Sequence, residues 1–401
     1  MLQEGWGMTR ATCRTCFLCQ TISASLTIFA ITIGMAGCAG SSSATSTPPA
    51  ITTPTPPAPP TPSAQPKFAY TANELTANLS GYSVDPTTGA LTPLAGFPIA
   101  SGTNPVFITH DPANKFAIVA DIASDKINVY AINATSGMLT PVPPFAYATG
   151  REPRSITIDP TGQFVYVVNS YTDNISAFVM SPTGVLTPVP GSPFAPGGSL
   201  NGTNACCVVT DPSGKFLYLQ DRTNVYAYTI NSTTGVLTFV NALAIPSFAK
   251  AIGNGLAVDP TGAYLYSVAS GPALFQTLTI NPTTGAIALG PISPMAFPNG
   301  SYTISLDPTG RFAYTVENSQ YLVAYSVLNG VMTSLNSSSP AALGSSQLAI
   351  DPSGSFVYAL QTSTLNNVTG FRINPTGTLS ALPSSPTPSG GWPYSMTITS
   401  Q

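Results

Sequence analysis

The chain has 401 residues, of which only 7% are charged, and its formal net charge is −3. Forty prolines and 34 glycines interrupt short apolar runs, a composition typical of many short strands joined by tight turns. Because the chain holds only 12 Lys and Arg in total, it has no basic stripe to neutralise a phosphate backbone, and nucleic acid is excluded as a partner.

Residues 1–38 have the features of an export signal peptide. Two arginines precede an apolar stretch over residues 24–36, which ends in small residues. The segment Met35-Ala36-Gly37-Cys38 resembles the lipobox of bacterial lipoproteins, and this resemblance implies that the thiol of Cys38 is lipidated and becomes the mature N-terminus. The alternative is an ordinary secretory signal in which the cysteine occurs by chance.

Residues 39–66 consist almost wholly of Ser, Thr, Ala and Pro, which predicts a disordered tether. Such a tether would hold the following domain away from a membrane to which the lipid on Cys38 binds. Ala39 after the lipidated cysteine, by analogy with lipoprotein sorting, favours the outer membrane. We therefore expect a protein of the cell envelope, anchored in the outer membrane or at the cell surface and facing the periplasm or the exterior.

A repeat of 44 to 52 residues fills the rest of the chain. One aromatic residue opens a strand in each unit, at Phe68, Phe116, Phe164, Phe216, Tyr264, Phe312 and Phe356. An Asp-Pro turn precedes this aromatic residue in every unit except the first, at Asp111, Asp159, Asp211, Asp259, Asp307 and Asp351. A second marker, a Gly-centred turn of the type DPTTGALT, also occurs seven times. Two independent markers therefore give seven units.

Each unit divides into four short strands, which in the third unit cover residues 155–158, 164–168, 175–180 and 185–189. Four antiparallel strands form one propeller blade, so the repeat predicts an all-β, seven-bladed β-propeller over residues 67–401. The first unit opens at its second strand, and residues 392–399 align with residues 152–159. We expect this C-terminal strand to complete blade 1 and to close the ring.

The stretch SITIDPTGQFVYVVN over residues 155–169 resembles the lactonase family of seven-bladed propellers and its YVTN-repeat relatives, and the likeness covers residues 67–401. Members include 6-phosphogluconolactonases and muconate-cycloisomerase-like enzymes, so the resemblance implies chemistry on a lactone ring. These enzymes carry a Pro-Arg-His element where this chain has Pro153-Arg154-Ser155, so the arginine is present and the histidine is replaced. The single histidine, His110, falls where other units carry aliphatic residues, and we expect it to be packed rather than to act as a base.

A ring of polar side chains is predicted near one face of the propeller. Five positions after each aromatic residue stand Asn73, Asp121, Asn169, Asp221, Ala269, Glu317 and Gln361, here called the collar. As a functional site, the collar would bind a ligand through its Asn, Asp and Gln members, with Arg154 and Glu317 as the catalytic candidates. The alternative is that these side chains only hydrogen-bond the backbone where the strands turn.

No metal or other cofactor is expected. Calcium could be held by the collar carboxylates Asp121, Asp221 and Glu317, but no compact calcium-binding loop occurs in the sequence. Cys206 and Cys207 align with Arg154 and Ser155, and in an exported protein lipidated at Cys38 they would be the only thiols. They form either a strained vicinal disulfide or two small buried thiols.

Two functions remain open from the sequence. The first is a lactone hydrolase that acts outside the cytoplasm on a sugar lactone or a related cyclic ester. The second is a non-catalytic envelope propeller that binds a glycan, a peptide or a partner protein through its loop face. In either case we expect a monomer.

Overall fold

The computed structural model describes residues 64–195, 205–245, 255–269, 274–290, 295–296, 301–317, 320–340, 347–362 and 365–401. The chain divides into two compact units, Met1–Thr55 and Pro56–Gln401, and every described residue belongs to the second. The expected signal peptide, Cys38 and all but the end of the expected tether lie outside the described residues.

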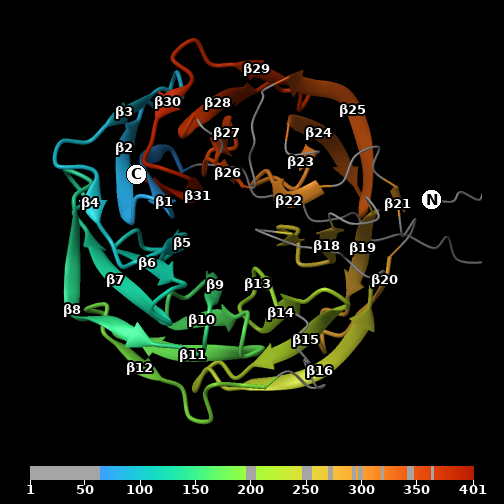
Figure 1. Cartoon of the computed structure of the whole chain (residues 1–401). Coiled ribbons are helices and arrows are strands. Elements are labelled where there is room, and N and C mark those ends of the chain that lie inside the picture. Colours follow the sequence, from blue (N-terminus) through green and yellow to red (C-terminus); the bar gives the residue numbers. More distant parts are fainter. Residues whose placement is uncertain are drawn as a thin grey trace, which may run out of the picture. The chain divides into compact units, whose positions relative to one another are not determined.

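The second unit is an all-β, seven-bladed propeller, which confirms the prediction from the repeat (Figure 1). Strands β1 to β31 form seven antiparallel sheets around a common centre. Within the described ranges there is no helix, and so none that is long and apolar enough to cross a bilayer.

The first three blades follow the chain from the N-terminal side. Blade 1 contains β3 (Leu91–Pro93), β2 (Asn78–Val84), β1 (Pro66–Asn73) and β31 (Pro393–Ser400), and β4 (Ile99–Ala100) pairs with β2. Blade 2 contains β5 (Pro105–His110), β6 (Phe116–Asp121), β7 (Lys126–Ile132) and β8 (Leu139–Ala148). Blade 3 contains β9 (Pro153–Ile158), β10 (Phe164–Asn169), β11 (Asn174–Met180) and β12 (Leu186–Pro188). The four strands expected for the third unit are therefore confirmed, with ends shifted by one or two residues.

The other four blades repeat this order. Blade 4 contains β13 (Cys207–Thr210), β14 (Phe216–Gln220), β15 (Asn224–Ile230) and β16 (Leu237–Ala244). Blade 5 contains β17 (Leu256–Val258), β18 (Tyr264–Ala269), β19 (Leu274–Ile280) and β20 (Ile287–Leu289), with β21 (Met295–Ala296) on β19. Blade 6 contains β22 (Ser301–Leu306), β23 (Phe312–Glu317), β24 (Tyr321–Leu328) and β25 (Val331–Pro340). Blade 7 contains β26 (Leu348–Ile350), β27 (Phe356–Gln361), β28 (Asn367–Ile373) and β29 (Leu379–Ala381), with β30 (Thr387–Pro388) on β28.

The C-terminal strand closes the ring as expected. Strand β31 pairs antiparallel with β1, from Pro66 opposite Ser400 to Asn73 opposite Pro393. It is the inner strand of blade 1, in red beside the blue β1 in Figure 1. The first blade is therefore built from both ends of the propeller, which leaves β1 without a free edge.

The Asp-Pro turns are held by their own aspartates. The Oδ1 atom of Asp159 accepts hydrogen bonds from the backbone N–H groups of Gln163 (2.8 Å) and Phe164 (2.6 Å), and its Oδ2 accepts one from Thr161 (3.1 Å). The carboxylate thus accepts hydrogen bonds from the backbone N–H groups that the turn leaves unpaired. Because these bonds replace those to water, the carboxylate can be buried.

The hydrophobic core lies between successive blades. One cluster joins blade 2 residues such as Ile118 to blade 3 residues such as Val165, and another joins Phe356 of blade 7 to Leu91 of blade 1. A tyrosine two positions after the opening aromatic residue adds a polar contact across five of these boundaries, because its hydroxyl donates to a glycine carbonyl of the next blade. The pairs are Tyr70–Gly137, Tyr166–Gly235, Tyr218–Gly285, Tyr314–Gly377 and Tyr358–Gly89.

Candidate functional site

The two faces of the propeller differ in their connections. The tight turns after the first and third strand of each blade lie on one face, here called the turn face. The connections between the second and third strands, which are equally short, and the connections between blades, several of which are long, lie on the other face, here called the loop face. Loops carry most of the binding and catalytic groups of proteins.

A cavity of about 680 Å³ lies around the central axis, lined by the inner strands and the Asp-Pro turns of the turn face. Every blade contributes a buried apolar side chain to the lining, and these residues are Phe107, Ile156, Val208, Leu256, Ile304, Leu348 and Met396. Aliphatic and proline side chains are the commonest lining residues, and the aspartates of the lining, Asp211, Asp307 and Asp351, already accept backbone hydrogen bonds. This part of the channel therefore offers little that could polarise a carbonyl group.

His110 is the exception in this cavity. Its Nδ1 lies 2.6 Å from the Thr397 hydroxyl oxygen of the ring-closing strand, and the residue is partly buried in the cavity wall. Burial lowers the pKa of His110 to about 4, which the neighbouring Asp111 carboxylate opposes. His110 is therefore neutral at pH 7 and packed on one side, as the sequence led us to expect, although its position lines the channel rather than the core.

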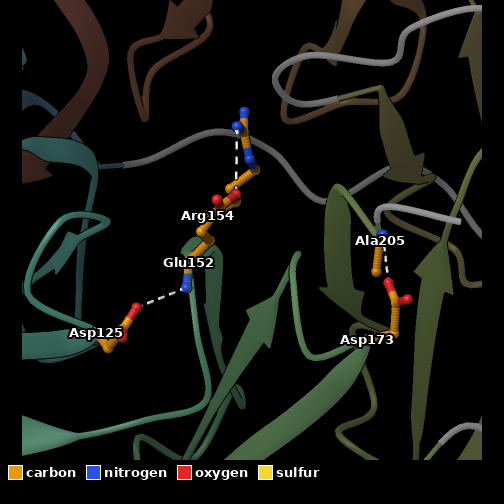
Figure 2. Close-up of polar contacts among 5 residues, drawn as sticks. All are labelled: Asp125, Glu152, Arg154, Asp173 and Ala205. Carbon is orange, nitrogen blue, oxygen red and sulfur yellow. Dashed lines mark hydrogen bonds and ion pairs between the residues drawn. The ribbon is translucent and has the colours of Figure 1, made fainter. Parts of the chain in front are cut away.

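The loop face carries the polar groups at the other mouth of the channel. Arg154, at the start of inner strand β9, forms an ion pair with Glu152 (Nη2 to Oε2, 3.9 Å), and Figure 2 shows the two side chains together. About a third of each side chain is exposed, 34% for Arg154 and 38% for Glu152, so a ligand can reach both. The Nε atom of Arg154 is buried without a hydrogen-bond partner among the described residues.

Glu152 is held in an unusual backbone conformation, with φ at 58°. Its backbone N–H donates to Oδ1 of Asp125 (2.9 Å, Figure 2), and its carbonyl accepts the N–H of Ser170 (2.8 Å). In the next blade, Asp173 likewise accepts the N–H of Ala205 (3.4 Å, Figure 2). At these two boundaries, a carboxylate of one blade therefore fixes the start of the inner strand of the following blade. In blade 3 this contact also fixes the position of Glu152.

Tyr394 meets Arg154 across the mouth. Tyr394 belongs to β31 of blade 1, but its ring packs against the cluster between blades 2 and 3. Burial raises the pKa of Tyr394 to about 12, while the charge of Arg154 and its hydrogen bond to the tyrosine act to lower it. The phenol therefore stays protonated at neutral pH and is a hydrogen-bond donor beside a guanidinium.

The collar residues lie where the sequence placed them, at the ends of the second strands, but their side chains are buried. The relevant members are Asn73, Asp121, Asn169, Asp221, Glu317 and Gln361, all at most 6% exposed. Nδ2 of Asn73 donates to Asn78 (2.8 Å) and Ser80 (2.9 Å), and Asn169 makes the same two contacts in blade 3. These amides join the two strands of a hairpin.

The collar carboxylates have similar structural partners. Asp121 accepts the backbone N–H groups of Thr103 (2.6 Å) and Asn104 (2.9 Å). Asp221 accepts two backbone N–H groups of its own hairpin and the hydroxyl of Tyr226 (2.8 Å). The contacts favour the interpretation that the collar stabilises turns. Among the described residues there is also no group of three or more His, Cys, Asp or Glu side chains suited to a metal ion.

The two catalytic candidates from the sequence stand on different blades. Arg154 is on blade 3 with Glu152, whereas Glu317 is on blade 6, where it is 3% exposed and accepts the hydroxyl of Tyr325 (2.5 Å). Glu152 takes the place beside Arg154 instead.

Cys206 and Cys207 lie at the start of the inner strand of blade 4, the blade that follows Arg154 in the ring. Both are buried, and their sulfur atoms lie 2.7 Å apart as free thiols. The hydrogen bond to Cys207 and burial raise the pKa of the Cys206 thiol well above its usual range. Cys206 is close enough to Arg154 for the guanidinium charge to act on it.

Sequence reasoning missed Glu152 and Tyr394, although a signal for Tyr394 was present. The alignment of residues 392–399 with residues 152–159 puts Tyr394 in the position of Arg154, so both had to stand at the mouth. No pattern in the sequence showed that the side chain of Tyr394 would approach the guanidinium of Arg154.

Known proteins share this fold. A family model described as lactonase, 7-bladed beta-propeller matches residues 101–297, which span blades 2 to 5. A protein from Bacteroides uniformis whose name gives 6-phosphogluconolactonase as a provisional function has a similar structure. The TM-score is 0.71 at 17% sequence identity, over 84% of this chain and 100% of the other. A protein from Bacteroides fragilis with the same provisional name has a TM-score of 0.71 and 17% sequence identity, over 85% of this chain and 99% of the other.

The periplasmic gluconolactonase of Pseudomonas aeruginosa is also similar, with a TM-score of 0.65 and 16% identity, over 83% of this chain and 99% of the other. No curated protein sequence matches the chain. At these identities the solved structures show the fold alone. The chain is a lactonase-like seven-bladed propeller.

Proposed function

We propose that this lactonase-like propeller hydrolyses a sugar lactone or a related cyclic ester at the loop-face mouth of its channel. The observation that carries the proposal is the exposed ion pair of Arg154 with Glu152 (3.9 Å), and Tyr394 lies near enough for the Arg154 charge to act on its hydroxyl. These residues supply a carboxylate base and two donors for a developing oxyanion, which are the groups that ester hydrolysis needs.

The reaction follows from this arrangement. Glu152 takes a proton from a water molecule, whose oxygen attacks the lactone carbonyl carbon. The guanidinium of Arg154 and the hydroxyl of Tyr394 donate hydrogen bonds to the oxyanion of the tetrahedral intermediate. The ring C–O bond then breaks, and the alkoxide takes the proton back from Glu152. The product is the open-chain hydroxy acid.

Two further observations support this assignment. The Arg154 side chain is 34% exposed, so its guanidinium can donate to a ligand at the mouth. Similar structures are named gluconolactonase and, provisionally, 6-phosphogluconolactonase. With only 12 Lys and Arg in the chain, a neutral lactone suits this mouth better than a phosphorylated one.

The experiment is a comparison of hydrolysis rates for D-glucono-1,5-lactone. Arg154→Ala and Glu152→Gln should each lower kcat/KM by about 100-fold, the usual cost of removing one oxyanion donor or a general base. Glu317→Gln is the matched control, because it neutralises a buried carboxylate on the far side of the ring. A loss in the Glu317 variant without a loss in the Glu152 variant would identify Glu317 as the base. No hydrolysis by the wild type on any sugar or aliphatic lactone would leave the binding propeller instead.

We also propose that the protein is exported, lipidated at Cys38 and held as a monomer at the outer membrane. The signal-like residues 1–38, the lipobox and the Pro-rich segment after it support this, and one similar structure is named as periplasmic. The test is partition into detergent: the wild type should enter the Triton X-114 phase and Cys38→Ser the aqueous phase. Equal partition of the two proteins would contradict the proposed lipid anchor at Cys38.

A further inference from the structure

Trp392 stands out among the large apolar side chains of the loop face. It is 47% exposed, and its φ of 52° is one that L residues with bulky side chains rarely adopt. Its backbone N–H donates to Oδ1 of Asn366 (2.9 Å), and its carbonyl accepts the N–H of Glu74 (3.0 Å). The surrounding hairpins thus hold a large indole in a strained conformation at the surface, which is a common property of functional positions.

The same construction occurs two blades away, at Glu152. There φ is 58°, the N–H donates to Oδ1 of Asp125 (2.9 Å), and the carbonyl accepts the N–H of Ser170 (2.8 Å). The next contact repeats as well, since Tyr171 donates to Arg151 in blade 3 where Leu75 donates to Gly391 in blade 1. Trp392 therefore occupies in blade 1 the position that Glu152 occupies in blade 3.

This equivalence indicates where the indole lies. Glu152 meets Arg154, the residue two positions later, on the mouth of the channel. Trp392 has the same relation to Tyr394, the residue two positions later in β31, and Tyr394 interacts with Arg154. Trp392 and Tyr394 therefore occupy on blade 1 the backbone positions that Glu152 and Arg154 occupy on blade 3, at the loop-face start of the inner strand.

We propose that Trp392 is the platform on which the sugar ring of the substrate stacks, so that the enzyme selects carbohydrate lactones over aliphatic ones. This inference rests on the hydrolysis proposed above and deepens it. The face of an indole carries negative charge density and binds the C–H groups of a sugar ring, whose hydroxyl groups stay free at the ring edge. Glu152 can accept hydrogen bonds from those hydroxyls, and Arg154 can donate to their oxygen atoms.

Another exposed aromatic residue provides the contrast. Tyr171, at the blade 3 position that corresponds to Leu75 in blade 1, is 59% exposed, but the guanidinium carbon of Arg151 lies 3.9 Å from the centroid of its ring. One face of Tyr171 is therefore already covered by a cation. Tyr171 serves as a matched control for the effect of removing an exposed aromatic side chain from this face.

The first test measures binding without turnover. Trp6 and Trp392 are the only tryptophans of the chain, so in full-length Trp6→Phe the fluorescence comes from Trp392 alone. D-glucono-1,5-lactam, a neutral analogue that resists hydrolysis, should change this fluorescence saturably. δ-Valerolactam, which has the same ring amide but no hydroxyl groups, should need at least about a tenfold higher concentration.

The second test measures turnover of D-glucono-1,5-lactone and of δ-valerolactone. Trp392→Ala should raise KM for the sugar lactone by about tenfold with little change in kcat, and leave the aliphatic lactone nearly unaffected. Trp392→Phe should recover most of the loss, and Tyr171→Ala should behave as the wild type.

The outcomes separate the two proposals. A fluorescence change without hydrolysis would keep the platform and reject the proposed reaction. Hydrolysis of the sugar lactone without a fluorescence change, or an equal effect of Trp392→Ala on both lactones, would reject the platform and keep the reaction. The absence of both signals would reject both.

Discussion

The ring of Phe356 on blade 7 lies directly over Gly89 on blade 1, so closely that a Cβ atom at Gly89 would stand 2.4 Å from Cδ1 of the phenylalanine. The same contact occurs at every blade boundary, from the opening aromatic residue of one blade to the turn glycine of the next. The pairs are Phe68–Gly137, Phe116–Gly184, Phe164–Gly235, Phe216–Gly285, Tyr264–Gly330, Phe312–Gly377 and Phe356–Gly89. The two sequence markers of the repeat, the opening aromatic residue and the turn glycine, are therefore the two sides of one contact between neighbouring blades. The last pair, Phe356–Gly89, joins blade 7 to blade 1.

This contact predicts that Gly89→Ala destabilises the propeller by about 2–4 kcal/mol, because the new methyl group collides with Phe356 and alanine is strained at a φ of 73°. Gly162→Ala is the matched control, since Gly162 has the same φ of 73° but only Pro112 at 3.5 Å nearby. The control should lose only about 1 kcal/mol from backbone strain. Urea unfolding of both variants measures the difference, and equal losses would contradict the role of this contact.

Removal of residues 392–401 should abolish cooperative folding of the propeller. The deletion takes away β31, leaves β1 with an unpaired edge and opens the boundary between blades 7 and 1. The cost should reach the full stability of a domain, about 5–15 kcal/mol. Removal of Gln401 alone, which leaves β31 complete, should change little. The far-UV spectrum and the melting curve decide, and a truncated chain that melts like the wild type would refute ring closure by this strand.

His110 should make the stability depend on pH in the acid range. Burial lowers the pKa of the folded ring to about 4 from 6.5, so between these values the unfolded chain binds a proton that the folded protein does not. Stability is therefore complete above pH 6.5 and is lost as the pH falls toward 4. The loss is at most about 3 kcal/mol, since solvent in the channel reduces it.

The variant His110→Thr, which copies Thr210 at the same position of blade 4, isolates this effect from the carboxylates that both proteins share. Urea unfolding at pH 7 and at pH 4.5 should show a smaller loss for the variant than for the wild type. Identical losses would mean that the ring is fully hydrated in the channel.

Cys206 and Cys207 should be unreactive as thiols in the folded protein. Both are buried, and the pKa of Cys206 is raised, so little thiolate is present at pH 8. We expect no alkylation by iodoacetamide at pH 8 and alkylation of both after unfolding in urea. If unfolding without a reductant leaves both unmodified and the mass is about 2 Da low, the pair is a vicinal disulfide instead.

The sequence predicted the propeller because its determinants are local and repeated. Asp159 holds its turn through atoms at most five residues away, and the glycine of the following turn needs a positive φ whatever surrounds it. Seven copies of these signals determined the blade count and the four strands of each blade. The alignment of the last segment with residues 152–159 predicted the closure for the same reason.

The candidate site could be predicted only in part. Arg154 was proposed because it begins an inner strand in a recognisable element, and Glu317 was proposed as its partner from the polarity of the collar. Polarity alone does not distinguish a side chain that faces a ligand from one that satisfies a hairpin. Glu317 is 3% exposed against Tyr325, and only packing decides that.

By itself, the sequence therefore determined the number of blades, their strands and the strand that closes the ring, because turn chemistry and alternation act over a few residues. Only the tertiary structure decided which side chains share the mouth of the channel. Arg154 and Tyr394 are far apart in the chain and meet because closure by β31 brings blade 1 within reach of blade 3. Such a meeting depends on ring geometry and side-chain packing, which no local pattern records.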